Sequence, residues 1–150
     1  MSLLEQIDQD YLQAYKGRDT QTVEVLRLLK SSLKNEAIKL GGLGTALSED
    51  QALAVLNREV KQRHDSIAQF KAGAREDLAA KEHAELTIIQ HYMPKSMDEQ
   101  ALASLIDSVL AQTGASQKSD MGRVMAELKL KLSNPADVGR AAALVSQKLQ

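Results

Sequence analysis

Apolar residues recur every three or four positions along most of this 150-residue chain, which is the spacing of one face of an α-helix. In the first helix that this spacing predicts, the apolar face is made of Leu4, Ile7, Tyr11 and Tyr15. In the second it is made of Val23, Leu26, Leu29, Leu33, Ala37 and Leu40. No four-residue run alternates apolar and polar side chains in the β-branched or aromatic manner of a half-buried strand. The pattern therefore predicts an all-α protein.

Glycines and capping residues divide the first part of the chain into about four helices. We expect them over residues 3–16, 20–40, 49–72 and 75–92. Gly17 ends the first helix, and Asp19 or Thr20 caps the second. Ser48 and Gln51 form a capping box for the third helix. The turn at Gly73 is short, so the third and fourth helices are expected to form an antiparallel hairpin.

Pro94 is the clearest break in the chain, and three shorter helices are expected after it. A second capping box, Ser96-Met97-Asp98-Glu99, begins the fifth helix, and Gly114 ends it. Ser119 or Asp120 caps the sixth, and Ser133-Asn134-Pro135 begins the last. We therefore expect an N-terminal helical domain over residues 1–94, with the long hairpin, and a C-terminal three-helix domain over residues 95–150.

Composition narrows the class of protein further. The chain is 43% apolar, contains no Cys, and balances 19 Lys and Arg against 20 Asp and Glu. This excludes a disordered protein, a disulfide scaffold and a thiolate metal site. The longest stretch without a charged side chain is about ten residues, half of what a membrane-spanning helix needs. The N-terminus lacks a signal peptide pattern, so we expect a soluble, cytoplasmic protein with no membrane partner.

The residues that most often carry chemistry form no recognisable catalytic or metal site. No Glu lies three residues before His64, His83 or His91, and the last two are too far apart for a helical metal pair. Ser31 and Lys34 have the Ser-x-x-Lys spacing but lack its companion motifs. Gly42-Leu43-Gly44 is half of a dinucleotide fingerprint and follows a helix instead of a strand. We expect no catalytic residue, metal or cofactor, although a site assembled from distant helices stays open.

Basic residues give the remaining signal. Arg27, Lys30 and Lys34 follow one ridge of the second predicted helix. From Lys118 to the end, the sequence contains six basic and three acidic residues. The candidate nucleic-acid-binding residues are Arg27, Lys30, Lys34, Arg58, Lys61, Arg123, Lys129, Lys131 and Arg140. The alternative is a solvated helix face, because overall basicity and interleaved aromatic residues are lacking.

Several segments, in this order and spacing, resemble the YqeY family, a group of small bacterial GatB/YqeY-domain proteins. They are VLRLLKSSLKNE (25–36), EVKQRHDSI (59–67), GAREDL (73–78), YMP (92–94), and TGA (113–115) leading into DMGRVM (120–125). The resemblance covers essentially the whole chain. It implies an all-α protein with a long-helix N-terminal part and a three-helix C-terminal part.

The resemblance also implies a relation to the tail domain of the B subunit of tRNA-dependent amidotransferases. Those enzymes convert Glu-tRNA(Gln) or Asp-tRNA(Asn) with ammonia from glutamine, and their tail contacts the outer part of the tRNA. Their amidase and phosphate-transfer sites lie in other domains, which have no counterpart here. A family label of carbon-nitrogen ligase with glutamine as amido donor is therefore read as inherited from the larger enzyme.

The segments that match the tail are Met121–Met125, Ala136-Asp137 and the final helix. By this resemblance Gly122 allows close helix packing, and Val124 and Met125 are core residues. The family often has Lys-Gly-x-Ala-Asp where this chain has Ser133-Asn134-Pro135-Ala136-Asp137, so a basic residue is lost. The nearest basic candidates are then Lys129, Lys131 and Arg140.

We therefore expect a non-catalytic helical binding module that contacts tRNA or an aminoacyl-tRNA complex. The alternative is a protein-interaction adaptor that docks on an aminoacyl-tRNA synthetase or amidotransferase. A third possibility is an amidotransferase that acts alone.

Overall fold

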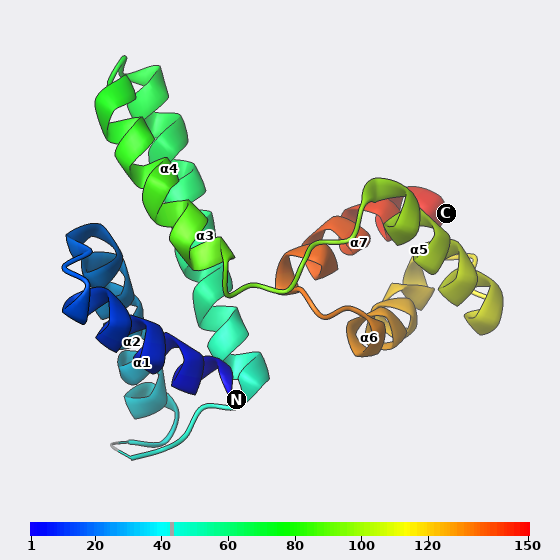
Figure 1. The fold of residues 1–150 in the computed structure, drawn as a ribbon. Helices are drawn as coiled ribbons and strands as arrows, with labels where there is room; N and C mark the ends of the chain where they lie inside the picture. Colours follow the sequence, from blue (N-terminus) through cyan, green and yellow to red (C-terminus); the bar gives the residue numbers. More distant parts are fainter. Residues whose placement is uncertain (43) are drawn as a thin grey trace. The chain divides into compact units, whose positions relative to one another are not determined.

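The structure, a computed structural model, describes residues 1–42 and 44–150 (Figure 1). Its elements are α1 (Leu3–Lys16), α2 (Thr20–Gly41), α3 (Glu49–Ala72), α4 (Glu76–Gln90), α5 (Glu99–Thr113), the 3-10 turn η1 (Lys118–Asp120), α6 (Met121–Lys131) and α7 (Pro135–Lys148). No strand occurs among the described residues, and the all-α prediction is confirmed. The middle residue of the Gly42-Leu43-Gly44 motif lies outside them.

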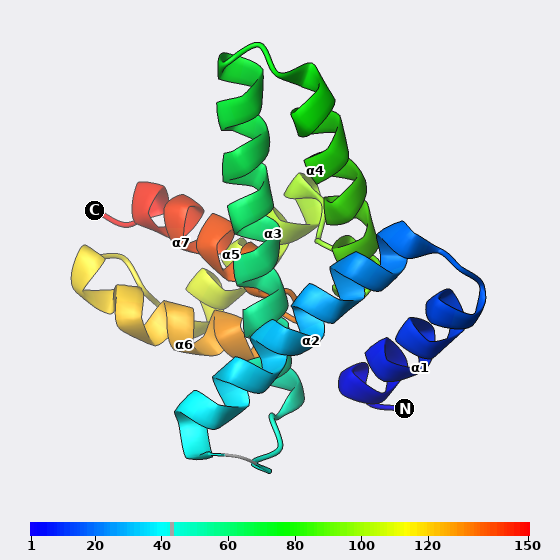
Figure 2. The same ribbon diagram turned by 90° about the vertical axis from the view of Figure 1, so that its left-hand side faces the viewer.

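The chain divides into two compact units, Met1–Met93 and Pro94–Gln150. The sequence-based boundary was placed one residue later, after residue 94. In the first unit, α3 and α4 lie side by side and antiparallel in both views, joined by a short turn at Gly73 (Figures 1 and 2). The predicted helical hairpin is therefore present.

The core of the first unit lies between α1, α2, α3 and the end of α4. Its buried members include Ile7, Val25, Leu26, Leu29, Leu33, Ala52, Val55, Leu56 and Ile89. A second cluster, Ile67, Ala79 and Leu86, joins α3 to α4 farther along the hairpin. The predicted apolar face of α2 is wrong at its end, because Leu40 is 50% exposed. Leu33 is the last buried core residue of α2, and the final turns of the helix continue beyond the core.

The turn between α3 and α4 has its left-handed residue one position after the glycine. Gly73 has φ −86°, whereas Ala74 has φ 57°. The N–H of Arg75 donates to the Phe70 carbonyl at 2.8 Å, which is the six-to-one bond of a Schellman motif. The end of α1 repeats this arrangement, with Arg18 at φ 58°. Both predicted helix ends are confirmed. In each turn, however, the left-handed position is occupied by Arg18 or Ala74 and not by the neighbouring glycine.

The core of the second unit is made by α5, α6 and α7. Its buried residues are Leu102, Ile106, Val109, Val124, Leu128, Ala141, Val145 and Leu149. Val124 is a core residue as expected, and Met125 is partly buried against this core. The expected packing role of Gly122 is wrong: a Cβ built there meets nothing within 4 Å.

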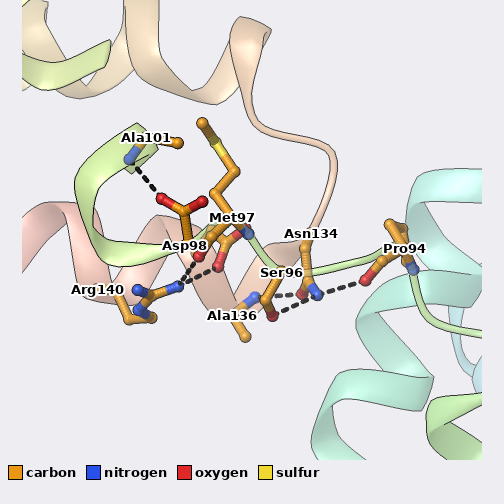
Figure 3. A network of polar contacts seen from close by, with 9 residues as sticks. Pro94, Ser96, Met97, Asp98, Ala101, Asn134, Ala136 and Arg140 are labelled. Carbon is orange, nitrogen blue, oxygen red and sulfur yellow. Dashed lines mark hydrogen bonds and ion pairs between the residues drawn. The ribbon is translucent and has the colours of Figure 1, made fainter. Parts of the chain in front are cut away.

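The start of α5 differs from the predicted capping box. Asp98, not Ser96, is the N-cap, and its carboxylate accepts a hydrogen bond from the Ala101 N–H at 2.7 Å (Figure 3). The Ser96 hydroxyl instead accepts from the Asn134 side chain at 3.2 Å. A contact from a residue 38 positions away therefore displaces the local cap.

Candidate nucleic-acid interface

Three of the predicted cations lie together on α2 and face α1. Arg27, Lys30 and Lys34, which we call the cationic ridge, share one helix face because of their i, i+3, i+7 spacing. Asp8 on α1 pairs with Lys30, and Tyr11 contacts Arg27. As residue numbers rise on α1 they fall on α2, so the two helices are antiparallel. The ridge and the polar side of α1 therefore form one surface.

Lys30 is at the centre of this surface. Its ammonium Nζ lies 2.8 Å from Oδ1 of Asp8 and 4.6 Å from the centroid of the Tyr11 ring. An ammonium over an aromatic face is attracted by the ring quadrupole. The Tyr11 ring also stacks on Tyr15, with centroids 6.5 Å apart and planes at 27°. The surface thus combines a fixed cation with a stacked pair of aromatic rings.

Arg27 forms the second link between the ridge and the rings. Its Nη2 donates a long hydrogen bond of 3.4 Å to the Tyr11 hydroxyl. This bond, with a smaller contribution from nearby Glu24, raises the pKa of the Arg27 guanidinium. Arg27 is therefore a permanent cation at the edge of the aromatic pair.

Two hollows lie along the ridge. Tyr11, Ser31 and the three ridge cations line one of about 330 Å³. The other, of about 280 Å³, shares Lys30 and Lys34 with the first. Its apolar lining residues include Leu4, Ile7, Leu33, Ala37, Ile38 and Leu47. The first volume is at the lower end of the range for small-ligand pockets, about 300–1,000 Å³.

Arg58 and Lys61 belong to a different surface. Arg58 on α3 forms an ion pair with Glu36 at 2.8 Å, and its hydrogen bond lowers the pKa of that carboxyl group. Glu36 is two and a half helical turns beyond Arg27, so it points away from the ridge. Lys61 is exposed on α3. The structure does not bring these two residues together with the cationic ridge.

The predicted cations of the second unit are dispersed. Arg123 forms an ion pair with Asp120 at 3.2 Å. Lys129 and Lys131 are both exposed in the last turn of α6. Two positions along a helix correspond to about 200° of rotation, so these lysines project to nearly opposite sides. They do not form one cationic patch.

Arg140 is part of a structural network. Its Nη1 donates to the Met97 carbonyl at 2.8 Å (Figure 3). The same nitrogen donates to Asp137 Oδ1 at 2.9 Å. Asp137 is 1% exposed, and its other oxygen accepts from the Met97 N–H at 3.0 Å. Asn134 caps α7 and donates to the Pro94 carbonyl at 2.8 Å. These contacts hold the segment before α5 against the start of α7. They come from the turn in which this chain lacks the lysine of the family motif.

A buried charge cluster in the first unit was not foreseen from the sequence. Arg63 is 8% exposed, and its guanidinium lies 2.9 Å from Glu59 and 3.6 Å from Glu85. Glu59 also accepts from the Ser32 hydroxyl at 2.9 Å. The cluster connects α2, α3 and α4, so its members contribute to the fold.

Tyr11 and Tyr15 are the site residues that sequence reasoning missed. They were assigned to the apolar face of the first helix, and aromatic residues near the cations were considered lacking. The i, i+4 tyrosine spacing and the short turn over residues 17–19 are the signal that could have placed them against the ridge.

Metal and membrane features give no further candidate among the described residues. No group of three or more His, Cys, Asp or Glu side chains there is placed to hold a metal ion. No helix within residues 1–42 and 44–150 is long and apolar enough to cross a membrane. The absence of a metal, cofactor or catalytic residue stays a prediction.

The fold defines an all-α protein of two helical units, with a cationic and aromatic surface on the first. A family model described as "Yqey-like protein" matches residues 4–149, so the chain belongs to this family, as the sequence resemblance indicated.

Relatives are found in fungi under the name "Altered inheritance of mitochondria protein 41, mitochondrial". The protein of Saccharomyces cerevisiae (strain ATCC 204508 / S288c) is 30% identical over 128 residues, which are 81% of this chain and 68% of that protein. The protein of Pyrenophora tritici-repentis is 26% identical over 156 residues, 99% of this chain and 79% of its own length. The names of these relatives place them in mitochondria, which does not support the expected cytoplasmic location.

Proposed function

We propose that this protein is a non-catalytic helical module that binds tRNA or an aminoacyl-tRNA complex through the cationic ridge. The observation that carries the proposal is the grouping of Arg27, Lys30 and Lys34 around a hollow that Tyr11 also lines. The three residues extend over about 10 Å of helix axis, so they are able to contact successive phosphates. The resemblance to the amidotransferase tail lies in the second unit, and it supports RNA as the anionic partner of the protein as a whole.

The charge around the ridge sets the expected strength of binding. Asp8 neutralises part of the Lys30 charge, and Glu24 lies near Arg27. The whole chain has a net charge of −1. These charges favour a local contact of modest affinity, since non-specific RNA or DNA binding at physiological salt has dissociation constants of about 10⁻⁴–10⁻⁶ M.

Titration of labelled tRNA with the full chain at rising salt tests this proposal. If the ridge contacts about three phosphates, the log–log slope of affinity against salt is about −2. Affinity then falls about 20-fold between about 50 and 200 mM salt. No binding at the lower salt, or an affinity that does not change with salt, would contradict the proposal.

A second candidate, the protein-interaction adaptor, is favoured by the apolar hollow beside the ridge. Ile38 lines this hollow and Leu40 follows it near the C-terminal end of α2, and they are 42% and 50% exposed. A pull-down from lysate with and without nuclease separates the two functions. A synthetase or amidotransferase retained after nuclease treatment favours the adaptor, whereas its loss favours RNA binding. The third candidate, carbon-nitrogen ligation with glutamine, requires ammonia release from glutamine by the pure protein, and we expect none.

A further inference from the structure

We infer that α1 and α2 together bind an unpaired nucleotide, with its base stacked on Tyr15, its adjacent phosphate on Arg27 and a phosphate farther along the strand on Lys34. This specifies the RNA feature that the ridge recognises and rests on the proposed RNA binding. An unpaired nucleotide occurs in a loop or at a single-stranded end, whereas the bases of a duplex are already stacked and paired.

Tyr15 is the side chain placed to receive a base. It is 64% exposed, and one face of its ring stacks on Tyr11, so the ring still offers contact area to a ligand. A base on this ring would extend the existing stack from two rings to three. The remaining tyrosine, Tyr92, is 9% exposed and donates its hydroxyl proton to Asp10 at 2.6 Å. It is therefore unable to serve in the same way.

Among the described residues, the ridge cations on either side of Lys30 have fewer partners than Lys30 itself. Lys30 is held by Asp8 and the Tyr11 ring. Within residues 1–42 and 44–150, the one hydrogen bond of the Arg27 side chain is the long one to Tyr11. Lys34 is exposed and forms no ion pair within the part of the chain that the structure describes. Arg27 and Lys34 are about 10 Å apart along the helix, so they lie at the two ends of the hollow.

The chemistry of this surface favours single-stranded over double-stranded RNA. Proteins recognise paired RNA mainly by its shape and by contacts to phosphates and 2′-hydroxyls. Exposed aromatic rings beside cations are instead typical of proteins that bind unpaired bases. Tyr15 would add nothing to duplex binding, whereas it stacks on an unpaired base.

The experiment compares three labelled probes at about 50 mM salt: whole tRNA, a single-stranded oligoadenylate, and a blunt-ended RNA duplex that has the same number of phosphates and no loop. The proteins are the full wild-type chain, Tyr15→Ala, Tyr15→Phe and Leu12→Ala. Leu12 is the matched control, because it is an apolar side chain on α1 that is 55% exposed. Thermal unfolding of each variant checks that the fold is retained.

Tyr15→Ala is expected to weaken oligoadenylate binding by about 5- to 150-fold, the usual effect of removing a stacked ring. Tyr15→Phe and Leu12→Ala are expected to bind like wild type, and binding of the duplex is expected to be unaffected by Tyr15→Ala. The chain contains no Trp, so quenching of tyrosine fluorescence by oligoadenylate gives a second readout. Tyr15→Phe is expected to reduce this quenching while it retains affinity.

The outcomes separate the two proposals. Binding of tRNA with no preference for oligoadenylate over the duplex, or with no effect of Tyr15→Ala, would overturn the unpaired-nucleotide site and leave the proposed function standing. Failure of wild type to bind any of the three probes would overturn both.

Discussion

The ammonium of Lys30 on α2 lies 2.8 Å from a carboxylate oxygen of Asp8 on α1, within the surface proposed to bind RNA. Both side chains are substantially exposed, at 40% and 61%. An exposed ion pair contributes little to stability, typically about 0.2–1 kcal/mol. Its carboxylate, however, opposes the approach of a phosphate. Asp8 thus lowers the affinity of the ridge for an anion.

Asp8→Asn is therefore expected to strengthen tRNA binding. Removal of one negative charge beside Lys30 is worth roughly 0.5–1 kcal/mol, or about two- to fivefold in affinity. The loss of unfolding free energy is expected to stay below about 1 kcal/mol. Asp65→Asn, an equal change of charge at an exposed position on α3, is the control. Equal effects of the two substitutions would show that net charge, not the ridge, controls binding.

Tyr92→Phe is expected to change stability in a pH-dependent way. Burial, followed by the hydrogen bond to Asp10, raises the pKa of the Tyr92 hydroxyl above its ordinary 10.0. The folded state holds this proton more tightly than the unfolded state, so the stabilisation is present in full below pH 10 and is lost as pH rises above it. At neutral pH the substitution costs about 1–2 kcal/mol, because Asp10 loses a donor.

Denaturant titrations from neutral to strongly alkaline pH measure this effect. Wild type is expected to lose stability above pH 10 more steeply than Tyr92→Phe. Tyr15→Phe, which removes the hydroxyl of an exposed ring, is expected to keep the wild-type profile. Identical alkaline slopes for wild type and Tyr92→Phe would contradict the assignment.

Asp137→Ala is expected to destabilise the second unit by about 2–4 kcal/mol. The substitution leaves the Met97 N–H without its side-chain acceptor and removes a charged partner from Arg140. Asp107→Ala is the matched control, because Asp107 also pairs with a base, Lys148, but its side chain is 63% exposed. The control is expected to cost less than about 1 kcal/mol. Hydrogen exchange over residues 97–148 measures both, and similar protection in the two variants would refute the role given to Asp137.

Ala74→Gly is expected to stabilise the α3–α4 hairpin by about 0.5–1 kcal/mol. Ala74 has φ 57°, a conformation that glycine adopts without steric cost. Gly73→Ala is the comparison, because a Cβ there lies 3.5 Å from the Gln69 carbonyl, an ordinary contact, and we expect a change below about 0.5 kcal/mol. Chemical denaturation measures both, and a destabilising Ala74→Gly would contradict the strain inferred at this turn.

The helices could be predicted from the sequence because their limits depend on neighbouring residues. Ser48 accepts from the Gln51 N–H, and Asn134 accepts from the Ala136 N–H, as their sequence positions suggest. The cap of α5 was assigned wrongly because Ser96 is engaged by Asn134, a contact that no local pattern contains. Local rules therefore located the helices better than the contacts between them.

The candidate site could be predicted only in part for the same reason. Spacing along one helix was enough to group Arg27, Lys30 and Lys34. It did not show that Arg140 is committed to Asp137, nor that Tyr11 lies across from the ridge. A sequence gives the number of charges, whereas their availability depends on partners from other elements.

The most direct test of the central claim is the salt dependence of tRNA binding by a ridge variant in which Arg27, Lys30 and Lys34 are all changed to Gln. Its control changes Lys71, Lys81 and Lys95 to Gln, three exposed lysines outside every candidate cluster. The slope of log affinity against log salt concentration is expected to be shallower by about 2 in the ridge variant. This variant is also expected to bind at least about tenfold more weakly at about 50 mM salt. The control is expected to keep the wild-type slope. Equal losses in the two variants, or an unchanged slope in the ridge variant, would contradict the claim that this ridge is the RNA-binding surface.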